Sequence, residues 1–570
     1  MGEVSKTRSD ESLTSFSSAS LPCVQSLSST RSLSVALEPS LLRGVPLHQA
    51  LSRWGRHWVS SEATHAYELS RQTARLDNFL SHDWHTSGWK KFLALLVLFN
   101  SRAAAIASTG MTMLLAILQS ASIVPDGVWV TCSGYATFAL VFLFWQRLRA
   151  LVRPRVVFLD KLCIAQHDPM LKERAILGLA AFLDSSDNLT VLWSPAYFRR
   201  LWCSYEMAAF FRHADKARGR HVTVMPVTSA VLLCVLAVQF WIMSIGEFLV
   251  LRDVEVGGSV GESFWRNVVI VGALTTGIAG ALVPVTLYIG IQLMDDLQKL
   301  PQQLQGFRVQ DSLSSCCSWQ HVRPDTGERI PCDRALVFAM LRKWYGRSGR
   351  AAGLGEEHLD AFNDFVTNRL APSVLKTVGF GNFPVAYAFY LSSSANVPWL
   401  AASVGQLARG PAPDASGADV FLWAVRVLLN VTFLIMMGMF ISRFSFSLSW
   451  LGHHLVHHGH CRWKLCLTMV LSQVSVAFVG SLWAAFRTSM YWRQDSWLPV
   501  LPFLVLMGCT IGLFAQGWRV SSTPSTPSTE AGEISEVEGR RPRMSGVPVS
   551  AAESQEFFTV SPRDLITVSF

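Results

Sequence analysis

The chain has 570 residues, of which 50% are hydrophobic and only 16% are charged, with a formal net charge of +9. Soluble globular domains carry about 25% charged residues, so this composition is not that of an ordinary soluble domain. The basic residues form no single patch but gather at the ends of apolar segments, for example Lys90 with Lys91 and Arg147 with Arg149. Such clusters are typical of cytosolic topology signals, so a nucleic-acid partner is not expected.

Both ends of the chain are predicted to be disordered. Residues 1–60 are rich in Ser and Leu without a sustained period, and residues 519–570 are rich in Ser, Thr, Pro and Glu. Neither segment can bury enough apolar surface to offset its ordering entropy. The 11 cysteines include no Cys-x-x-Cys pair, so neither a disulfide framework nor a zinc ribbon is indicated, and no metal ligands are assigned.

Residues 76–100 and 151–226 alternate short strands with helices when they are read together. Strands are expected at 76–81, at 155–160 and near 188–195, and a last one ends near residue 227. Strands that alternate with helices predict a parallel sheet covered on both faces. The two segments are separated by residues 103–146, an apolar hairpin. Because two crossings return the chain to the same side, the segments can still form one domain.

Seven segments are apolar enough and long enough to cross the roughly 30 Å of hydrocarbon in a bilayer. They are 103–124, 128–146, 226–246, 268–291, 420–441, 465–486 and 497–518. An eighth segment, 377–408, is uncharged but carries Pro384 and Pro398. If it also spans, the Arg- and His-containing loop 442–464 falls on the cytosolic side, as the positive-inside tendency favours.

The predicted fold class is therefore a multi-pass α-helical membrane protein with about eight spanning helices and a cytosolic α/β domain. The bilayer is its first partner, and both termini are expected in the cytosol. Segment 226–291 forms a transmembrane hairpin, 292–376 a cytosolic helical loop, and 377–518 four transmembrane helices. Within the loop, an amphipathic helix is expected, because apolar residues from Leu359 to Leu370 share one face.

A group of histidines stands out between the sixth and seventh of these eight helices. His453, His454, His457, His458, His460 and Cys461 include pairs at i and i+4, a spacing that can bind zinc. No carboxylate near them in the sequence completes a ligand set. An interfacial helix is the favoured interpretation.

Three short motifs in the α/β segments resemble the boxes of Toll/interleukin-receptor (TIR) domains. They are FLSH from Phe79, FLD from Phe158 with the loop that follows, and WCSYE ending at Glu206. The resemblance implies a flavodoxin-like parallel sheet, TIR–TIR self-association and hence a homo-oligomer. The fifth strand of that fold is not recognisable, because the chain becomes apolar directly after Val227.

The resemblance leaves two activities open, because some TIR domains are scaffolds and others cleave NAD. In the cleaving members the glutamate of the last motif is catalytic, which here is Glu206. Phe79 and Ser81 would line the NAD pocket and Trp202 would wall it. A carboxylate beside the ribose would stabilise the cation that forms as the glycosidic bond breaks. The structural alternative makes Glu206 a solvated helix residue and leaves Phe79 and Trp202 in the core.

Three functions follow from these patterns. The first is a membrane-anchored TIR-like signalling or interaction protein. The second is an NAD hydrolase acting through Glu206, with NAD as substrate and no resident cofactor assigned. The third is a channel or transporter regulated by the cytosolic domain, which Arg426 inside an apolar helix and the Pro-broken segment 377–408 favour. Because no inverted sequence repeat is found, transport ranks below signalling.

Overall fold

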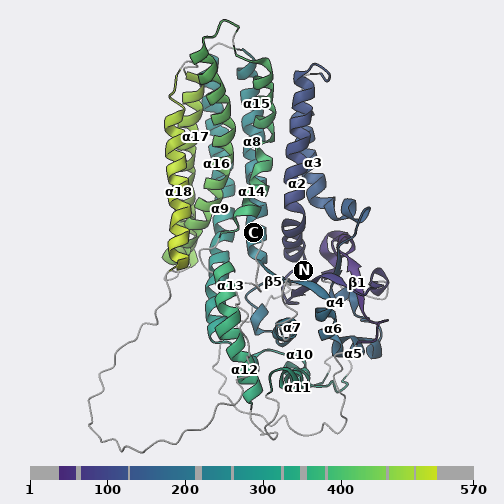
Figure 1. The fold of residues 1–570 in the computed structure, drawn as a ribbon. Coiled ribbons are helices and arrows are strands. Elements are labelled where there is room, and N and C mark those ends of the chain that lie inside the picture. The colour runs from purple at the N-terminus through teal and green to yellow at the C-terminus, as the bar shows by residue number, and fades with distance from the viewer. Residues whose placement is uncertain are drawn as a thin grey trace, which may run out of the picture.

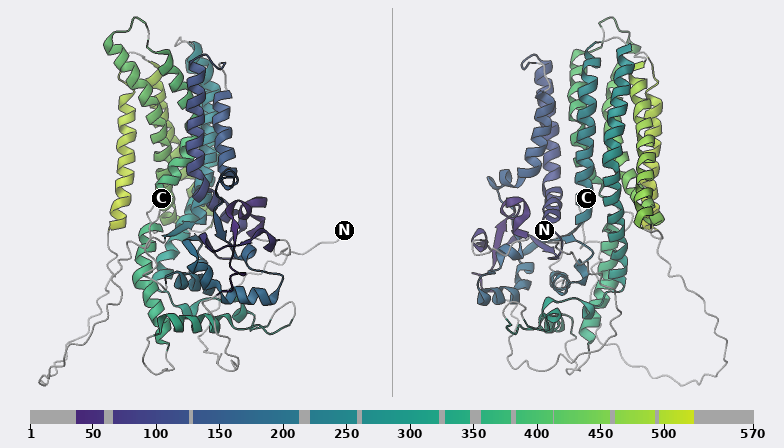
Figure 2. Two further views of the ribbon diagram at one scale, coloured as in Figure 1. Left: turned by 45° about the vertical axis from the view of Figure 1, so that its right-hand side comes forward. Right: turned by 180° about the vertical axis from the view of Figure 1, so that it is seen from behind.

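The structure is a computed structural model in which long helices stand above a small sheet domain (Figure 1). Two further views show the same division, with the long helices at one end and the sheet domain at the other (Figure 2). The residues that the structure describes are 37–58, 66–125, 129–211, 221–257, 262–322, 327–346, 356–378, 383–411, 413–456, 461–492 and 496–522.

The sheet has six strands in the order β2-β1-β4-β3-β5-β6. Their bounds are β1 Arg43–Pro46, β2 Arg71–Gln72, β3 Leu76–His82, β4 Val156–Phe158, β5 Ser186–Trp193 and β6 His221–Pro226. Strand β3 lies parallel to both β4 and β5, and β5 lies parallel to β6. The strands predicted on either side of the inserted hairpin therefore pair directly. This order is that of a doubly wound sheet, with its switch point between β3 and β5.

Short helices connect the parallel strands. They are α4 Asp160–Cys163, α5 Pro169–Leu177, α6 Leu179–Asp184, the 3-10 turn η3 Tyr197–Arg199, and α7 Leu201–Phe211. The Asp168 side chain caps α5 by accepting hydrogen bonds from two backbone amides of its first turn. The sequence MLKERAILGLAAFLDSS, residues 170–186, predicts a single amphipathic helix, but the structure divides it into α5 and α6 at Gly178, where a Cβ would lie 2.2 Å from the Leu37 side chain. The Leu37 side chain thus packs directly over Gly178.

The N-terminal disorder predicted for residues 1–60 is wrong for 43–58, while residues 1–36 lie outside the described part of the chain. Strand β1 is followed by α1 Leu47–Ala50 and the turn η1 Ser52–Trp58, and a further turn η2 spans Tyr67–Leu69. Val45 pairs antiparallel with Val157, and its side chain is completely buried. The segment pairs with the edge of β4, whose backbone groups would otherwise be unpaired.

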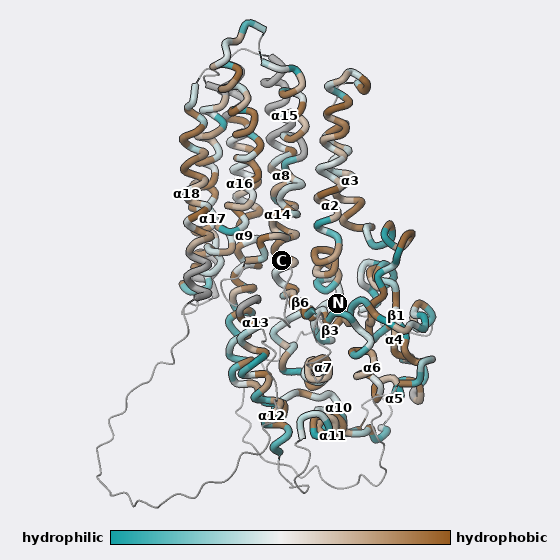
Figure 3. Tube along the Cα trace, viewed as in Figure 1, coloured by the Kyte–Doolittle hydropathy of each residue, from teal (hydrophilic) through white to brown (hydrophobic). Residues whose placement is uncertain are grey.

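Among the residues that the structure describes, five helices are long and apolar enough to cross a membrane, which indicates a membrane-embedded protein. Apolar residues predominate along the upper parts of the long helices, whereas polar residues gather around the sheet domain and α12 (Figure 3). The long helices are α2 Gly88–Ser120, α3 Trp129–Ala150, α8 Val227–Gly257, α9 Glu262–Gln305, α16 Gly417–Val456, α17 Cys461–Trp492 and α18 Val500–Ser522. The five are α2, α8, α9, α16 and α17.

Helix α2 corrects a predicted domain boundary. Separate helices were expected before residue 100 and from 103 onward, yet α2 is one continuous helix of 33 residues. Lys91, interpreted from sequence as a topology signal, is fully buried in its first turns against the sheet domain. The charge of Lys91 therefore belongs to the interior of the domain rather than to a membrane boundary.

Segment 377–408 is helical but broken in the middle. It contains α14 Val385–Ser393, a 3-10 turn η7 Ser394–Asn396, and α15 Val397–Arg409. The Ala395 carbonyl at the break accepts a hydrogen bond from the Tyr135 hydroxyl at 3.1 Å, and Ser244 also donates to it. The turn is thus satisfied by α3 and α8, as a broken helix inside a membrane bundle requires.

The loop predicted to begin at residue 292 starts later, because α9 continues to Gln305. It then contains η5 Val309–Asp311, α10 Ser315–Ser318, α11 Asp333–Tyr345, α12 Glu357–Phe365, the π-helical turn η6 Val366–Leu370 and α13 Ala371–Val378. The predicted amphipathic face is confirmed, since Leu359, Phe362 and Leu370 are buried. In Figure 1, α10 and α11 lie below α7, while α12 and α13 stand to its left.

Candidate functional site

The carboxyl ends of β3, β4 and β5 meet at one edge of the sheet, where open α/β sheets bind ligands. Strand β3 ends at His82, β4 is followed by Asp160, and β5 is followed by Ser194. Helix α7 runs beside this edge, and the Cys203 thiol lies 3.6 Å from the His82 carbonyl oxygen. All three motifs quoted for the TIR resemblance thus contribute side chains to one place.

Glu206 and Ser81 are brought together by the fold. The Ser81 hydroxyl donates a hydrogen bond to the Glu206 carboxyl group, and the Ser81 and Tyr197 hydroxyls lie 2.6 Å apart. Burial raises the pKa of Glu206 to about 8, with a further rise from the negative Asp160, although the Ser81 hydrogen bond opposes it. The carboxyl group is therefore protonated at neutral pH and acts as part of a hydrogen-bonded interior.

Phe79 and Trp202 have structural contacts that their predicted pocket roles did not include. Phe79 is completely buried and stacks on Phe158 with ring centroids 4.5 Å apart. The Trp202 indole packs edge-on against Tyr205 and donates a hydrogen bond to the Asp333 carboxylate at 3.2 Å. Phe79 thus belongs to the core between β3 and β4, whereas Trp202 connects α7 to α11.

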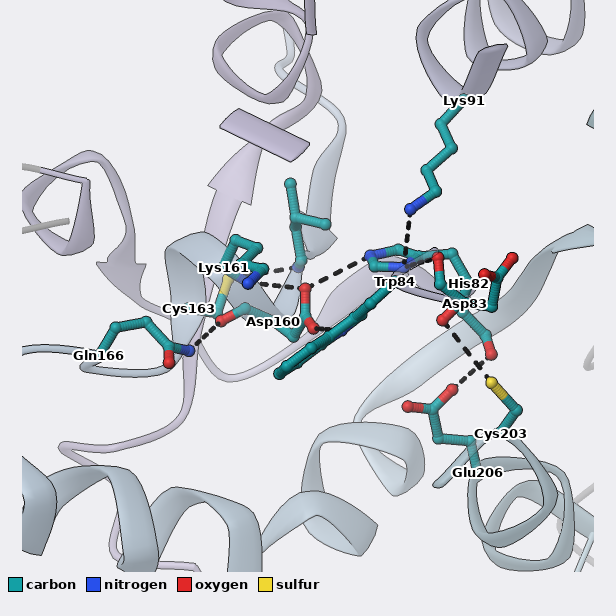
Figure 4. Close-up of polar contacts among 12 residues, drawn as sticks. His82, Asp83, Trp84, Lys91, Asp160, Lys161, Cys163, Gln166, Cys203 and Glu206 are labelled. Atoms are coloured by element: carbon teal, nitrogen blue, oxygen red, sulfur yellow. Dashed lines mark hydrogen bonds and ion pairs between the residues drawn. The ribbon is translucent and has the colours of Figure 1, made fainter. Parts of the chain in front are cut away.

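A second polar cluster at the same edge surrounds Asp160 (Figure 4). Its carboxylate lies 3.4 Å from the His82 imidazole and accepts a hydrogen bond from the Trp84 indole at 2.7 Å. Burial alone would raise the pKa of Asp160. Three neighbours lower this pKa by more than burial raises it: His82 through its charge and hydrogen bond, the Lys161 ammonium, and the Trp84 indole donor. The pKa of Asp160 falls to about 2 as a result. The buried Lys91 ammonium lies 3.5 Å from the other imidazole nitrogen.

Asp83 closes the switch point between β3 and β5. Its carboxylate accepts a hydrogen bond from the Ser194 hydroxyl at 2.6 Å, and it also accepts from the backbone and hydroxyl of Thr86. Burial alone would raise the pKa of Asp83. The hydrogen bonds from Ser194 and Thr86 lower this pKa by more than burial raises it, so the net shift is downward. The crevice in which such sheets hold ligands is here bridged by a direct Asp83–Ser194 contact.

Sequence reasoning assigned no role to several residues of this edge. His82 and Asp160 stand inside the quoted motifs, and Tyr197 stands beside them, so position in the motif was the available signal. Lys91 carried no such signal, because only the packing of α2 against η1 and β3 places its ammonium near His82. The edge thus combines a carboxyl group of lowered pKa, Asp160, with one of raised pKa, Glu206.

The two other polar features singled out in the sequence are partnered within the helix bundle. The His453 imidazole contacts Asp295 at 2.7 Å and Gln298 at 2.7 Å, both on α9, so a carboxylate distant in sequence meets this histidine. Residues 457–460 of the histidine group lie outside the described residues. Arg426 is buried and donates to the Ser496 and Met490 carbonyls, so it faces protein rather than lipid.

Comparison with known proteins adds no assignment. No family model matches the chain, and neither a curated protein nor a solved structure matches it.

Proposed function

We propose that the chain is a membrane-anchored signalling or interaction protein whose cytosolic sheet domain is a TIR-like interaction module. Its strand order β4-β3-β5-β6 agrees with the flavodoxin-like order that the motif resemblance implies. The three motifs converge on one edge of this sheet, where Ser81 contacts Glu206 and Cys203 contacts His82. These contacts join motifs more than 100 residues apart in the sequence.

The Ser81–Glu206 hydrogen bond is the observation that favours interaction over NAD cleavage. A catalytic carboxylate beside the ribose would act as an anion. Glu206 is instead protonated at neutral pH, because burial raises its pKa to about 8, and its carboxyl group is held by Ser81. NAD hydrolysis remains the alternative to be measured, since rearrangement of α7 would be needed to expose and ionise this group.

The proposed topology has eight spanning helices, with both termini and the sheet domain in the cytosol. A helix coincides with each predicted span, α14, η7 and α15 together covering the Pro-broken one. His453 contacts Asp295, so the C-terminal end of α16 lies beside the end of α9 that leads to the helical loop. This contact supports placing the connection between α16 and α17 on the same side of the bilayer as the helical loop that follows α9.

Self-association tests the interaction function directly. Two differently tagged copies of the full-length chain, expressed in one membrane, should crosslink and co-purify. Trp84 stands at the carboxyl edge with its side chain 53% exposed, and exposed aromatic residues are enriched in interfaces. Trp84→Ser should therefore weaken association severalfold, whereas Trp54→Ser, at a similarly exposed tryptophan on η1, should not. Chains that remain monomeric in the membrane would contradict the proposal.

An NAD assay separates the two activities. Purified full-length protein in nanodiscs, free and artificially clustered, should consume no NAD above the level of the Glu206→Gln variant. Cleavage that the substitution abolishes, with a loss on the order of 10²–10³ in rate, would establish the hydrolase instead. The Gln side chain keeps the shape and an acceptor for Ser81, so folding is not the variable.

Reporter tags test the topology. Tags at Thr30, Gln320 and Leu455 should be cytosolic, and tags at Gly258 and Asp414 should lie outside. An outside location for the tag at Leu455 would remove segment 377–408 from the spanning helices.

A further inference from the structure

Four side chains with metal-binding atoms meet in the loop between α9 and α12. They are Cys316, Cys317, His321 and Cys332, whose ligand atoms all lie within 4.8 Å of one another. The Cys317 sulfur lies 3.8 Å from that of Cys316, 3.9 Å from that of Cys332 and 3.7 Å from the His321 Nε2. The spacing contains no Cys-x-x-Cys pair, which is why the sequence indicated no ligand set here.

The distances are those of a tetrahedral zinc site. With zinc–sulfur bonds of about 2.3 Å and zinc–nitrogen bonds of about 2.0 Å, tetrahedral angles place two sulfurs about 3.8 Å apart. The same geometry places a sulfur and a nitrogen about 3.5 Å apart. A disulfide would instead require about 2.05 Å between sulfurs, and these cysteines are free. Three thiols and one imidazole around a common centre form a Cys₃His set.

The backbone turns so that His321 can reach this centre. Gln320 and His321 follow α10 with φ angles of 52° and 62°, in the left-handed region that costs non-glycine residues about 1 kcal/mol each. The turn is held by a hydrogen bond from the His321 amide to the Cys316 carbonyl at 2.8 Å. It returns the imidazole to the side of α10 on which the Cys317 sulfur lies.

Groups around the sulfurs fit a bound metal as well. The Asp333 backbone amide donates to the Cys316 sulfur at 3.2 Å, and the Ser314 hydroxyl lies 3.0 Å from the same atom. Donors of this kind stabilise a thiolate that is bound to a metal. We propose that Cys316, Cys317, His321 and Cys332 bind a structural zinc ion.

The site has a mechanical role, because its neighbours hold the start of α7. Leu313 exchanges two backbone hydrogen bonds with the chain before α7, donating to Arg199 at 2.7 Å and accepting from Leu201 at 3.1 Å. On the other side of the cluster, Asp333 accepts the Trp202 indole hydrogen bond. Four protein ligands leave no open coordination position, as in structural rather than catalytic zinc sites. The ion therefore clamps the loop onto α7 whichever function that helix serves.

Metal analysis tests the site on the full-length chain, purified in detergent through a tag without histidines. About one zinc ion per chain is expected by mass spectrometry. Cys332→Ser and His321→Ala should each lose it. Cys466→Ser, at an exposed cysteine on α17, and His358→Ala, on α12, should keep it. Zinc contents equal in ligand and control variants would overturn the proposal.

A second measurement needs no substitution and so does not depend on variant folding. In the wild-type protein, alkylation of Cys317 and Cys332 should be at least about tenfold slower with zinc than after chelation, because a metal-bound thiolate is not a free nucleophile. Cobalt exchanged into the site should give the absorption of a tetrahedral thiolate complex. Alkylation unaffected by chelation, or a disulfide linking these cysteines in protein isolated under thiol-blocking conditions, would contradict the zinc site.

Discussion

Asp160 at the start of α4 and Glu206 on α7 are carboxyl groups at the same edge of the sheet, yet they have opposite protonation states at neutral pH. Burial acts on both in the same direction, by disfavouring the charged form. Around Asp160 the charges of His82 and Lys161 overcome burial, and the pKa is about 2. Around Glu206 only the Ser81 hydroxyl opposes burial, and the pKa is about 8.

The difference shows that the protonation state of a glutamate cannot be inferred from its position in a motif alone. The β4 side of the edge supplies cations, while the α7 side supplies Ser81, Tyr197 and the Cys203 thiol. Burial also raises the pKa of both Tyr197 and Cys203 well above the usual values. The edge is thus divided into an ionised half and a neutral half.

The largest expected effect is on the pH dependence of stability around β3 and α7. The pKa of Glu206 rises from 4.5 in the unfolded chain to about 8, so its stabilisation is complete below about pH 4.5 and is lost as pH rises toward 8. The loss should reach at most about 1.4 kcal/mol per pH unit. Hydrogen-exchange protection of β3 amides in nanodiscs, corrected for intrinsic rates, measures it. Protection that does not fall between pH 5 and 8 would place Glu206 in an ionised environment.

Asp160→Asn should have the next largest effect, a destabilisation of about 2 kcal/mol at pH 7. The variant removes the anion that faces His82 but keeps an oxygen for the Trp84 indole. The wild-type contribution is complete above pH 3.8 and is lost as pH falls toward 2. Asp187→Asn is the matched control, because Asp187 pairs with the fully exposed Arg75 on the opposite edge of the sheet. Equal losses in the two variants would mean that the Asp160–His82 contact does not stabilise the fold.

Glu206→Gln should have the smallest effect at pH 6, under about 1 kcal/mol, since it replaces one neutral acceptor of the Ser81 hydrogen bond by another. Above pH 8 the variant should become more stable than the wild type, because it has no proton to lose. Thermal unfolding at the two pH values, monitored by tryptophan fluorescence, compares the chains. A variant that is destabilised more at pH 9 than at pH 6 would reverse the assignment of the neutral half.

The alternation of strands and helices was sufficient to predict the parallel part of the sheet, whereas only the motif resemblance placed Ser81 and Glu206 in one site. Local pattern failed where burial depends on distant residues. Val45 is completely buried where β1 pairs with β4 opposite Val157. Strand β1 has only four residues, Arg43–Pro46, too few to show a strand period in the sequence, and its partner lies more than 100 residues away.

The zinc ligands were missed for a related reason. Their convergence depends on two residues with positive φ and on the start of α11, neither of which leaves a spacing pattern in the sequence. Lys91 was misinterpreted because a cation beside an apolar run is typical of a membrane boundary. In the structure Lys91 is instead positioned by its contacts with Trp58 and His82.

Because α2 is one continuous helix, it connects the membrane part of the protein rigidly to the sheet domain. At 1.5 Å per residue its 33 residues extend about 50 Å. Its N-terminal part places Lys91 and Phe92 in the sheet domain. Its C-terminal part lies against α3, where the Ser108 hydroxyl donates to the Gly134 carbonyl. Spanning helices tilt when bilayer thickness changes. Because α2 has no break along its length, a tilt of α2 in the lipid must either rotate the whole sheet domain or separate Lys91 from His82.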